Sequence, residues 1–96
     1  MMTLKEQFKF FIIPYHSGIF NLFMHALSGF THYIAFSEKN VSLILAAFIL
    51  EEIGHGYDYF CKFDKTNKKR WIEIIPLKIV LCTIFVIVMM WIFNWF

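Results

Sequence analysis

The sequence has few charged residues and only two cysteines among its 96 residues. Aspartate, glutamate, lysine and arginine together make up 17%, whereas 59% of the residues are hydrophobic, which is far from the balance of a soluble domain. Cys61 and Cys82 form no CxxC pair, which excludes that motif and a disulfide framework. The net charge of +2 is too small to indicate a nucleic-acid-binding protein, so no nucleic acid is expected as a partner.

Internal repeats, low-complexity tracts and a cleavable signal sequence are also missing. An apolar stretch follows Lys5 and Lys9, but polar residues and Pro14 interrupt it and no small-residue cleavage motif follows. We therefore expect the whole chain, residues 1–96, to be mature and to form a single domain. Aromatic residues, in contrast, are abundant: thirteen Phe, three Trp and four Tyr are too many for a soluble core of this size to hide. The composition predicts a small, all-α integral membrane protein.

Three apolar stretches predict three membrane-spanning helices, at about 17–36, 41–60 and 76–96. Each is close to the roughly 20 helical residues that cross a bilayer core. The third carries no charge from Ile79 onward, which is the clearest signal of a membrane span. The polar turn 37–40 is short, so the first two spans are expected to pack as an antiparallel hairpin.

The segments outside these spans are predicted from proline, glycine and charge. Met1 to Lys9 reads as a polar lead, and a short interfacial helix is expected up to about Tyr15. Pro14 removes a backbone donor and Gly18 weakens a helix, which allows a break near Ser17 and Gly18. The run 62–70 is interpreted as a solvated basic loop, followed by an amphipathic interfacial stretch at 71–75 and by Pro76 at the start of the third span.

Lysine and arginine are unevenly distributed between the two sides that three spans would create. Lys39 is the one cation on the side of the 37–40 turn, whereas the other eight belong to the N-terminus, the 62–70 segment and, with Lys78, the start of the third span. Because cytoplasmic segments carry an excess of positive residues, the N-terminus is predicted to be cytoplasmic and the C-terminus outside. Nothing in this pattern separates a bacterial inner membrane from an endoplasmic reticulum.

Polar residues recur at helical spacing along the first two spans, so that each span presents one polar face. In the first span these residues are Asn21, His25, Gly29 and His32, and in the second they are Glu51, Glu52, His55 and Asp58. At ~1.5 Å per residue from the turn, His25 lies level with Glu51, and Asn21 lies level with His55. His16 joins this group only if the backbone breaks near Ser17 and Gly18, and His32 is expected to lie outside it.

These residues predict a metal site formed by His16, His25 and His55, with Glu51 or Asp58 as the catalytic carboxylate that completes or orients it. Two or three imidazoles with a carboxylate suit Fe(II), and zinc is chemically acceptable as well. Glu52 or Asp58 could instead orient a ligand imidazole.

An alternative, which the residues leave open, is that the same groups pair only to fix the helices against each other. In either case, the polar residues Asn21 and Ser28 are expected to form hydrogen bonds between helices. Gly29 and Gly54 are expected where the helices approach closely.

One set of these residues resembles a known membrane family. Tyr15-His16, Asn21 and His25, followed by Ile53-Gly54-His55-Gly56, resemble the small family related to the fungal 2-hydroxy-fatty-acid dioxygenase of the endoplasmic reticulum. The resemblance covers roughly residues 8–60. It implies iron-dependent α-oxidation, in which O₂ is used to shorten a 2-hydroxy fatty acid by one carbon. By position, it also implies that His16, His25 and His55 are the family's histidines.

A second set is similar to VanZ-like small membrane proteins, which have a histidine-glycine helix and a later acidic helix end. Residues 25–30, with Glu51-Glu52 and 57–60, carry this similarity, which implies no settled chemistry. A non-enzymatic structural or accessory subunit is the remaining alternative, and a homo-oligomer or partner subunit is left open.

The lead prediction is a membrane-embedded, Fe(II)-dependent lipid oxygenase. In it, the acyl chain lies among Phe20, Phe23, Phe48 and the third span. The substrate carboxylate then reaches Lys62 or Lys65 at the membrane surface.

Overall fold

The structure is a computed structural model that describes residues 2–16 and 18–96, and within these residues it contains helices, turns and no strand. The elements are α1 (Leu4–Ile12), the short 3-10 helix η1 (Pro14–His16), α2 (Ile19–Ser37), α3 (Val41–Cys61), α4 (Lys65–Glu73) and α5 (Ile75–Ile92). The all-α prediction is therefore confirmed. The second apolar stretch matches α3 to within a residue, whereas the helix in the third ends at Ile92 rather than at Phe96.

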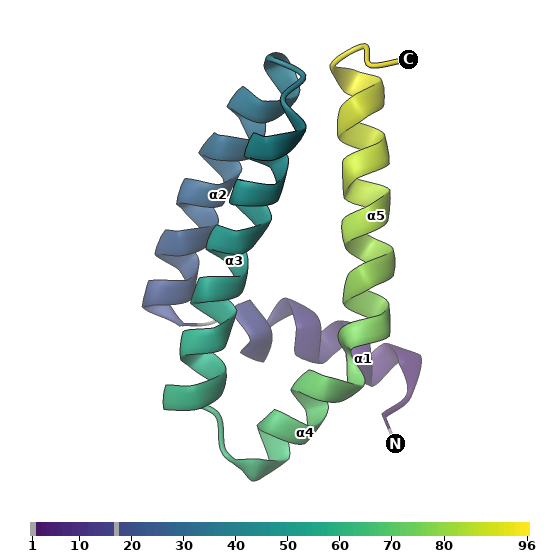
Figure 1. Cartoon of the computed structure of the whole chain (residues 1–96). Helices are drawn as coiled ribbons and strands as arrows, with labels where there is room; N and C mark the ends of the chain where they lie inside the picture. The colour runs from purple at the N-terminus through teal and green to yellow at the C-terminus, as the bar shows by residue number, and fades with distance from the viewer. Residues whose placement is uncertain (1, 17) are drawn as a thin grey trace.

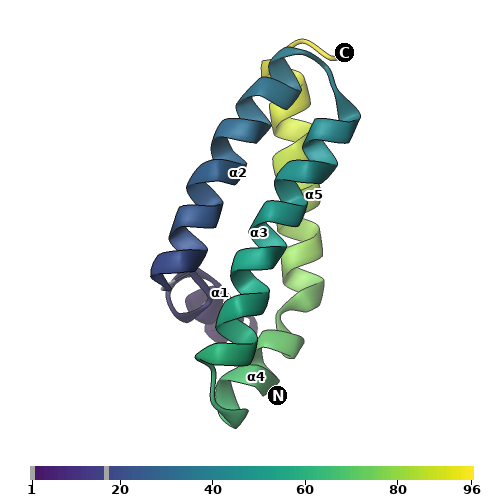
Figure 2. The same cartoon turned by 60° about the vertical axis from the view of Figure 1, so that its left-hand side comes forward.

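Helices α2 and α3 lie side by side and antiparallel, as predicted (Figures 1 and 2). The Asn40 side chain caps α3 by accepting a hydrogen bond from the Leu43 amide at 3.2 Å. At Gly54 the two helices are so close that an added Cβ would lie 3.0 Å from the Asn21 Cα, which confirms the close approach there. Nothing lies within 4 Å of a Cβ placed at Gly29, so the same prediction for Gly29 is wrong.

Helix α1 crosses the base of the hairpin instead of continuing into α2 (Figure 1). The pair α1–η1 and α2 meet at 95°. Gly18 has extended backbone angles at the start of α2, so the predicted break is present, although Ser17 itself lies outside the described residues. The short helix expected before Tyr15 is present as α1, and a capping box between Thr3 and Glu6 makes it begin at Leu4, within the predicted polar lead. Met1 also lies outside the described residues.

The predicted basic loop 62–70 is wrong over most of its length, because α4 begins at Lys65. Asp64 is the N-cap, and its carboxylate accepts a hydrogen bond from the Asn67 amide at 2.8 Å. Such a cap satisfies one of the free amides of the first helical turn, which allows a short, strongly basic segment to become helical. Pro76 lies in the first turn of α5, as predicted.

Helix α5 is the only described helix that is long and apolar enough by itself to cross a membrane, judged by length and composition. The bent pair of α1–η1 and α2 meets the same condition only when it is counted as one span. Helix α3 carries three carboxylates, those of Glu51, Glu52 and Asp58. None of the residues of α5 is buried, and the helix stands beside the hairpin (Figures 1 and 2). Three membrane spans therefore stay a prediction.

Two small apolar clusters connect these helices. At the base, Phe10, Tyr15 and Ile74 are buried together. At the other end, Ala35, Phe36 and Ile44 form the second cluster. The Trp95 indole donates a hydrogen bond to the Phe36 carbonyl at 3.0 Å, which ties the chain after α5 to the hairpin. Because α1 is held under the hairpin by the basal cluster, η1 faces the polar interior between α2 and α3.

Candidate metal centre

His16, His25 and His55 come together where η1, α2 and α3 meet. Their ring centroids are 4.8 Å apart for His16 and His25, 5.0 Å for His16 and His55, and 4.6 Å for His25 and His55. One nitrogen from each ring lies within 4.8 Å of the others. His55 is buried, and the other two are half-buried. The bend between η1 and α2 is what brings His16 to the other two histidines.

The hydrogen bonds of His16 and His25 fix which ring nitrogen is available. His16 Nδ1 lies 2.6 Å from the Phe11 carbonyl oxygen, and His25 Nδ1 lies 2.8 Å from the Asn21 carbonyl oxygen. A carbonyl oxygen only accepts, so each Nδ1 carries the proton and donates it. Each Nε2 then has a free lone pair. Metal-binding histidines typically have this arrangement, with the second ring nitrogen donating to a carbonyl or carboxylate.

Asn21 holds the third histidine. Its amide nitrogen is buried and donates to the Tyr15 carbonyl at 2.8 Å and to His55 Nδ1 at 3.1 Å. The Nδ1 of all three histidines is thus engaged, and no hydrogen bond within residues 2–16 and 18–96 involves any of their Nε2 atoms. In this arrangement the proton of His55 lies on Nε2. Binding of a metal by that nitrogen would move the proton to Nδ1. If the Asn21 side-chain amide then rotated by half a turn, its oxygen would accept a hydrogen bond from Nδ1.

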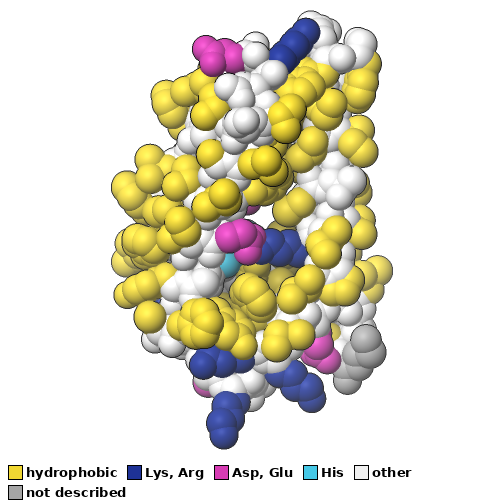
Figure 3. All heavy atoms as spheres, in the orientation of Figure 1, with side chains coloured by type: hydrophobic (Ala, Val, Ile, Leu, Met, Phe, Trp, Pro, Cys, Tyr) yellow, Lys and Arg dark blue, Asp and Glu magenta, His cyan; other side chains and the backbone are white. Residues whose placement is uncertain are grey.

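Tyr15 and Lys78 cover the cluster from the side of α5. The Tyr15 ring stacks on the His55 ring with centroids 3.7 Å apart, and its hydroxyl accepts a hydrogen bond from Lys78 Nζ at 2.6 Å. Lys78 also forms an ion pair with Glu52, where charges of opposite sign meet between α3 and α5 (Figure 3). Burial raises the pKa of Tyr15, which keeps the phenol neutral. Glu52 therefore binds Lys78, and not a ligand imidazole.

The two predicted catalytic carboxylates lie outside the group of three histidines. Glu51 accepts a hydrogen bond from Ser28 Oγ at 2.7 Å and lies 3.5 Å from His32 Nε2. Asp58 is buried against Gly18, where an added Cβ would lie 2.4 Å from Asp58 Oδ1. This carboxylate faces the N-terminus of α2, where the helix dipole favours negative charge. The structure does not bring either carboxylate into the set of ligand atoms, as far as the described residues go.

His32 lies outside the cluster, as predicted, and is buried among aromatic rings. It is 2% exposed and sits against Phe48 and Phe85, with ring centroids 4.7 and 5.0 Å away. The hydrogen bond from Asn21 to His55 and the one from Ser28 to Glu51 both join α2 to α3, so the prediction of interhelical bonds is confirmed for both residues.

Two imidazoles with a free Nε2 lone pair, and a third whose proton can move from Nε2 to Nδ1, fit a divalent metal. Imidazole suits iron and zinc alike, and three protein ligands leave positions open for water, O₂ or substrate. Metal–nitrogen bonds are about 2.0–2.1 Å for zinc. Nitrogens within 4.8 Å of one another would therefore need only a small inward movement, of under ~1 Å each, to share one ion.

Comparison of the chain with protein-family models, curated proteins and solved structures finds no match. The resemblances to the dioxygenase-related family and to VanZ-like proteins therefore stay predictions. What the site can do has to follow from its own side chains, of which Tyr15 and Lys78 were not predicted as part of it. Lys78 offered a signal, because it is the one cation in the apolar stretch that follows Pro76.

Replacing Asn21 by leucine is expected to weaken metal binding about 10- to 100-fold, because groups that orient metal-binding histidines have effects of this size. Leucine has a similar volume but cannot bond His55 Nδ1 or the Tyr15 carbonyl. Ser28→Ala is the matched control, because Ser28 is also buried on α2 but binds Glu51. Equal metal affinities in the two variants, measured by competition with a chelating dye, would contradict the role given to Asn21.

Acidification is expected to destabilise the metal-free protein. Burial lowers the pKa of His16 below its usual 6.5, although the bond to the Phe11 carbonyl opposes this. As the pH falls through about 6.5, the unfolded state therefore takes up a proton that the folded state does not, and stability decreases. Thermal unfolding of chelator-treated protein in detergent should show this decrease, and His16→Gln should make it shallower. An unchanged slope in that variant would contradict the assignment.

Proposed function

We propose that the protein is a membrane-embedded oxygenase in which His16, His25 and His55 bind Fe(II) and the substrate is a 2-hydroxy fatty acid or a similar lipid. The observation that carries this proposal is the convergence of three imidazoles, two of them held by backbone carbonyls with Nε2 free. The resemblance to the dioxygenase-related family supplies the reaction class. That family's histidines are expected at these same three positions.

The proposal includes three spans formed by α2, α3 and α5, with α1 and α4 at the membrane surface. Two features support it. Large apolar side chains are exposed along all three helices, among them Phe23, Leu45 and Ile84. On the face shown in Figure 3, apolar side chains cover the middle, and most of the charged side chains gather near the two ends. The N-terminus would then be cytoplasmic, by the distribution of lysine and arginine.

Bound Fe(II) would supply O₂ activation at its open coordination positions. The residues of the chain have three other tasks. The three imidazoles hold the ion without adding charge. Tyr15 stacks on His55 and, buried itself, keeps water from that side of the site. Shortening a 2-hydroxy fatty acid by one carbon consumes one O₂ and balances with CO₂ and water as the other products.

The space between α3 and α5 is the proposed path of the acyl chain. One cleft of about 400 Å³ is lined by Glu52, Lys78 and Cys82, among others. A second cleft of about 340 Å³ shares Cys82 and reaches Glu51 and Phe48. Both are mainly apolar, and Lys78, which covers the histidine cluster, lines the first of them.

This path differs in part from the sequence-based proposal for the lipid. Phe48 and the third apolar helix keep their place, whereas Phe20 and Phe23 are exposed on α2 and line neither cleft. Lys62 and Lys65 are exposed at the base of the molecule. Lys78 is therefore the better candidate to meet the substrate carboxylate, in exchange for Glu52.

Metal content and oxygen uptake of detergent-purified protein test the proposal. We expect about one iron per chain after anaerobic loading with Fe(II). Addition of a 2-hydroxy fatty acid should then give oxygen uptake and release of CO₂ in equal amounts, while the fatty acid that lacks the hydroxyl should not. Metal binding without uptake would remove the oxygenase assignment but leave the metal centre.

A structural or accessory role is the second candidate, and the bonds from Asn21 to His55 and from Ser28 to Glu51 favour it, since both fasten α2 to α3. In that case His55→Ala lowers thermal stability, and the wild-type protein binds no metal. For a VanZ-like role, Glu51→Gln and Asp58→Asn would matter more than any histidine variant.

A further inference from the structure

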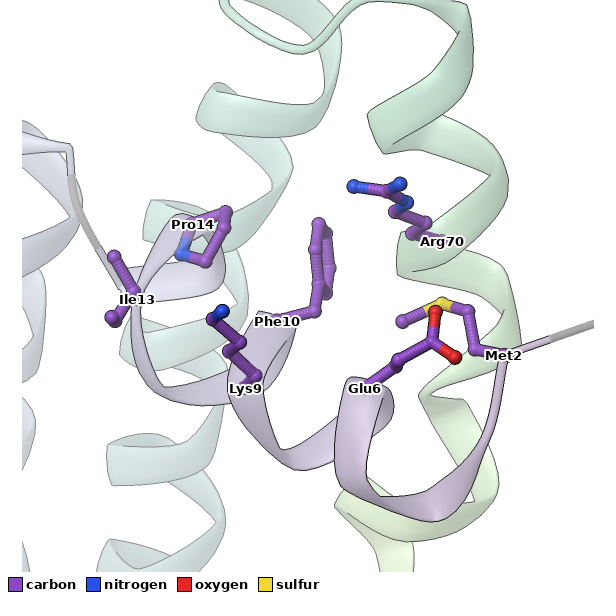
Figure 4. Close-up of a pocket in the computed structure, with 7 residues that line it drawn as sticks. All are labelled: Met2, Glu6, Lys9, Phe10, Ile13, Pro14 and Arg70. Carbon is purple, nitrogen blue, oxygen red and sulfur yellow. The ribbon is translucent and has the colours of Figure 1, made fainter.

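A separate cavity lies at the base of the molecule, between α1 and α4 (Figure 4). Its volume is about 340 Å³. Met2, Phe10 and Ile13 give it an apolar wall, while Lys9 and Arg70 bring two cations to it from different helices. In Figure 4, Arg70 extends from α4 toward the side of the cavity on which Phe10 lies. No histidine lines the cavity, so it is separate from the candidate metal centre.

The two cations have no ion-pair partner within the part of the chain that the structure describes. The one carboxylate in the wall belongs to Glu6, and it is already engaged, because Oε1 accepts hydrogen bonds from Thr3 Oγ1 at 3.0 Å and from the Thr3 amide at 3.4 Å. The cavity therefore has two cations against one carboxylate, and it combines a net positive charge with an apolar surface.

A smaller, more polar cavity of about 250 Å³ adjoins the first and shares Met2, Glu6 and Arg70 with it. It adds a third cation, Lys69, together with the Thr66 hydroxyl and the Glu73 carboxylate. An anion bound at Arg70 would thus have cations on both sides of it. The Thr66 hydroxyl and the Glu73 carboxylate, which can form hydrogen bonds with the hydroxyls of a ligand, would lie beside it.

We propose that these two cavities bind the headgroup of an anionic glycerophospholipid. The guanidinium of Arg70 presents a planar fork of donors that matches phosphate oxygens, and Lys9 and Lys69 add charge. The apolar wall of Phe10 and Met2 fits the glycerol backbone and the first acyl carbons, which a free phosphate ion does not have. Arg70 lies five residues before α5, the helix suited to cross a membrane, so the cavities lie where headgroups would be.

Thermal unfolding of the full-length protein in a neutral detergent tests this site. Dioctanoyl phosphatidylglycerol should raise the unfolding temperature, whereas dioctanoyl phosphatidylcholine and inorganic phosphate should not. In the double variant Lys9→Gln/Arg70→Gln, the concentration of phosphatidylglycerol that gives half of the shift should rise by about tenfold or more. Lys39→Gln is the control, because Lys39 is also exposed but lies at the opposite end of the hairpin.

Several results would overturn the proposal. Equal stabilisation by phosphatidylcholine would indicate an ordinary detergent-like effect of the acyl chains, and equal stabilisation by phosphate would indicate a simple anion site. An unchanged response of the double variant would place the lipid elsewhere. If the double variant does not fold, native mass spectrometry of the wild-type protein with the two lipids decides, because the proposal requires retention of phosphatidylglycerol alone. The metal centre does not enter any of these measurements.

Discussion

The double variant His25→Ala/His55→Ala is expected to bind no metal, while the wild-type protein binds about one ion per chain. Two of the three converging imidazoles are then missing, and His16 alone cannot hold an ion against water and buffer. Oxygen uptake with a 2-hydroxy fatty acid should fall to background. Elemental analysis of protein purified after anaerobic loading gives the first result, and an oxygen electrode gives the second.

His32→Ala is the matched control for this experiment. His32 lies on the same helix as His25 and is buried as His55 is, but its neighbours are Glu51 and aromatic rings. The His32→Ala protein should therefore be less stable than the wild-type protein but bind the same amount of metal. If His32→Ala removes the metal as completely as the double variant does, the loss reflects damage to the fold and the three-histidine centre is contradicted.

Gly54→Ala is expected to separate α2 from α3. The added Cβ would lie 2.7 Å from Asn21 Oδ1 and 3.0 Å from the Asn21 Cα, and the second of these contacts is with backbone that cannot turn away. Overpacking of this kind typically costs about 1–3 kcal/mol of folding free energy. Because Asn21 bonds His55, the displaced helix should also weaken metal binding.

Gly56→Ala distinguishes this clash from a general effect of changing a glycine in α3. A Cβ at Gly56 meets nothing within 4 Å, and alanine favours a helix by roughly 0.5–1 kcal/mol over glycine. Gly56→Ala should therefore unfold at the same temperature as the wild-type protein or higher, and keep its metal. Equal behaviour of the two variants in thermal unfolding and in metal titration would contradict the close approach at Gly54.

Helical periodicity was enough to predict the histidine pair on the hairpin. His25 and His55 lie on the polar faces of two helices joined by a short turn, and counting residues from that turn placed His25 level with Glu51 and Asn21 level with His55, so that the two histidines were about one helical turn apart in depth. The participation of His16 depended on a break that proline and glycine allow but do not require. The structure has this break, at a 95° bend, and the third imidazole joins the other two through it.

The carboxylates show where periodicity is insufficient. Glu51 and His55 lie on the same face of α3, but one helix face extends over several helical turns, so residues on it need not contact the same groups. Glu51 accepts a hydrogen bond from Ser28 and lies next to His32, farther from η1. The contacts of Tyr15 with His55 and Lys78 join η1, α3 and α5, which no local pattern can bring together. Helix α4 was missed for a different reason. The many charged residues of the segment led to its interpretation as a solvated loop, although Asp64 is a residue that can cap a helix.

X-ray absorption spectroscopy of the zinc-loaded protein tests the central claim most directly, since zinc replaces iron without redox chemistry. Three imidazole nitrogens should appear at about 2.0–2.1 Å. In His16→Ala the number of imidazoles should fall to two. A spectrum of the wild-type protein with one imidazole or none, or one that His16→Ala leaves unchanged, would show that the three histidines do not share an ion.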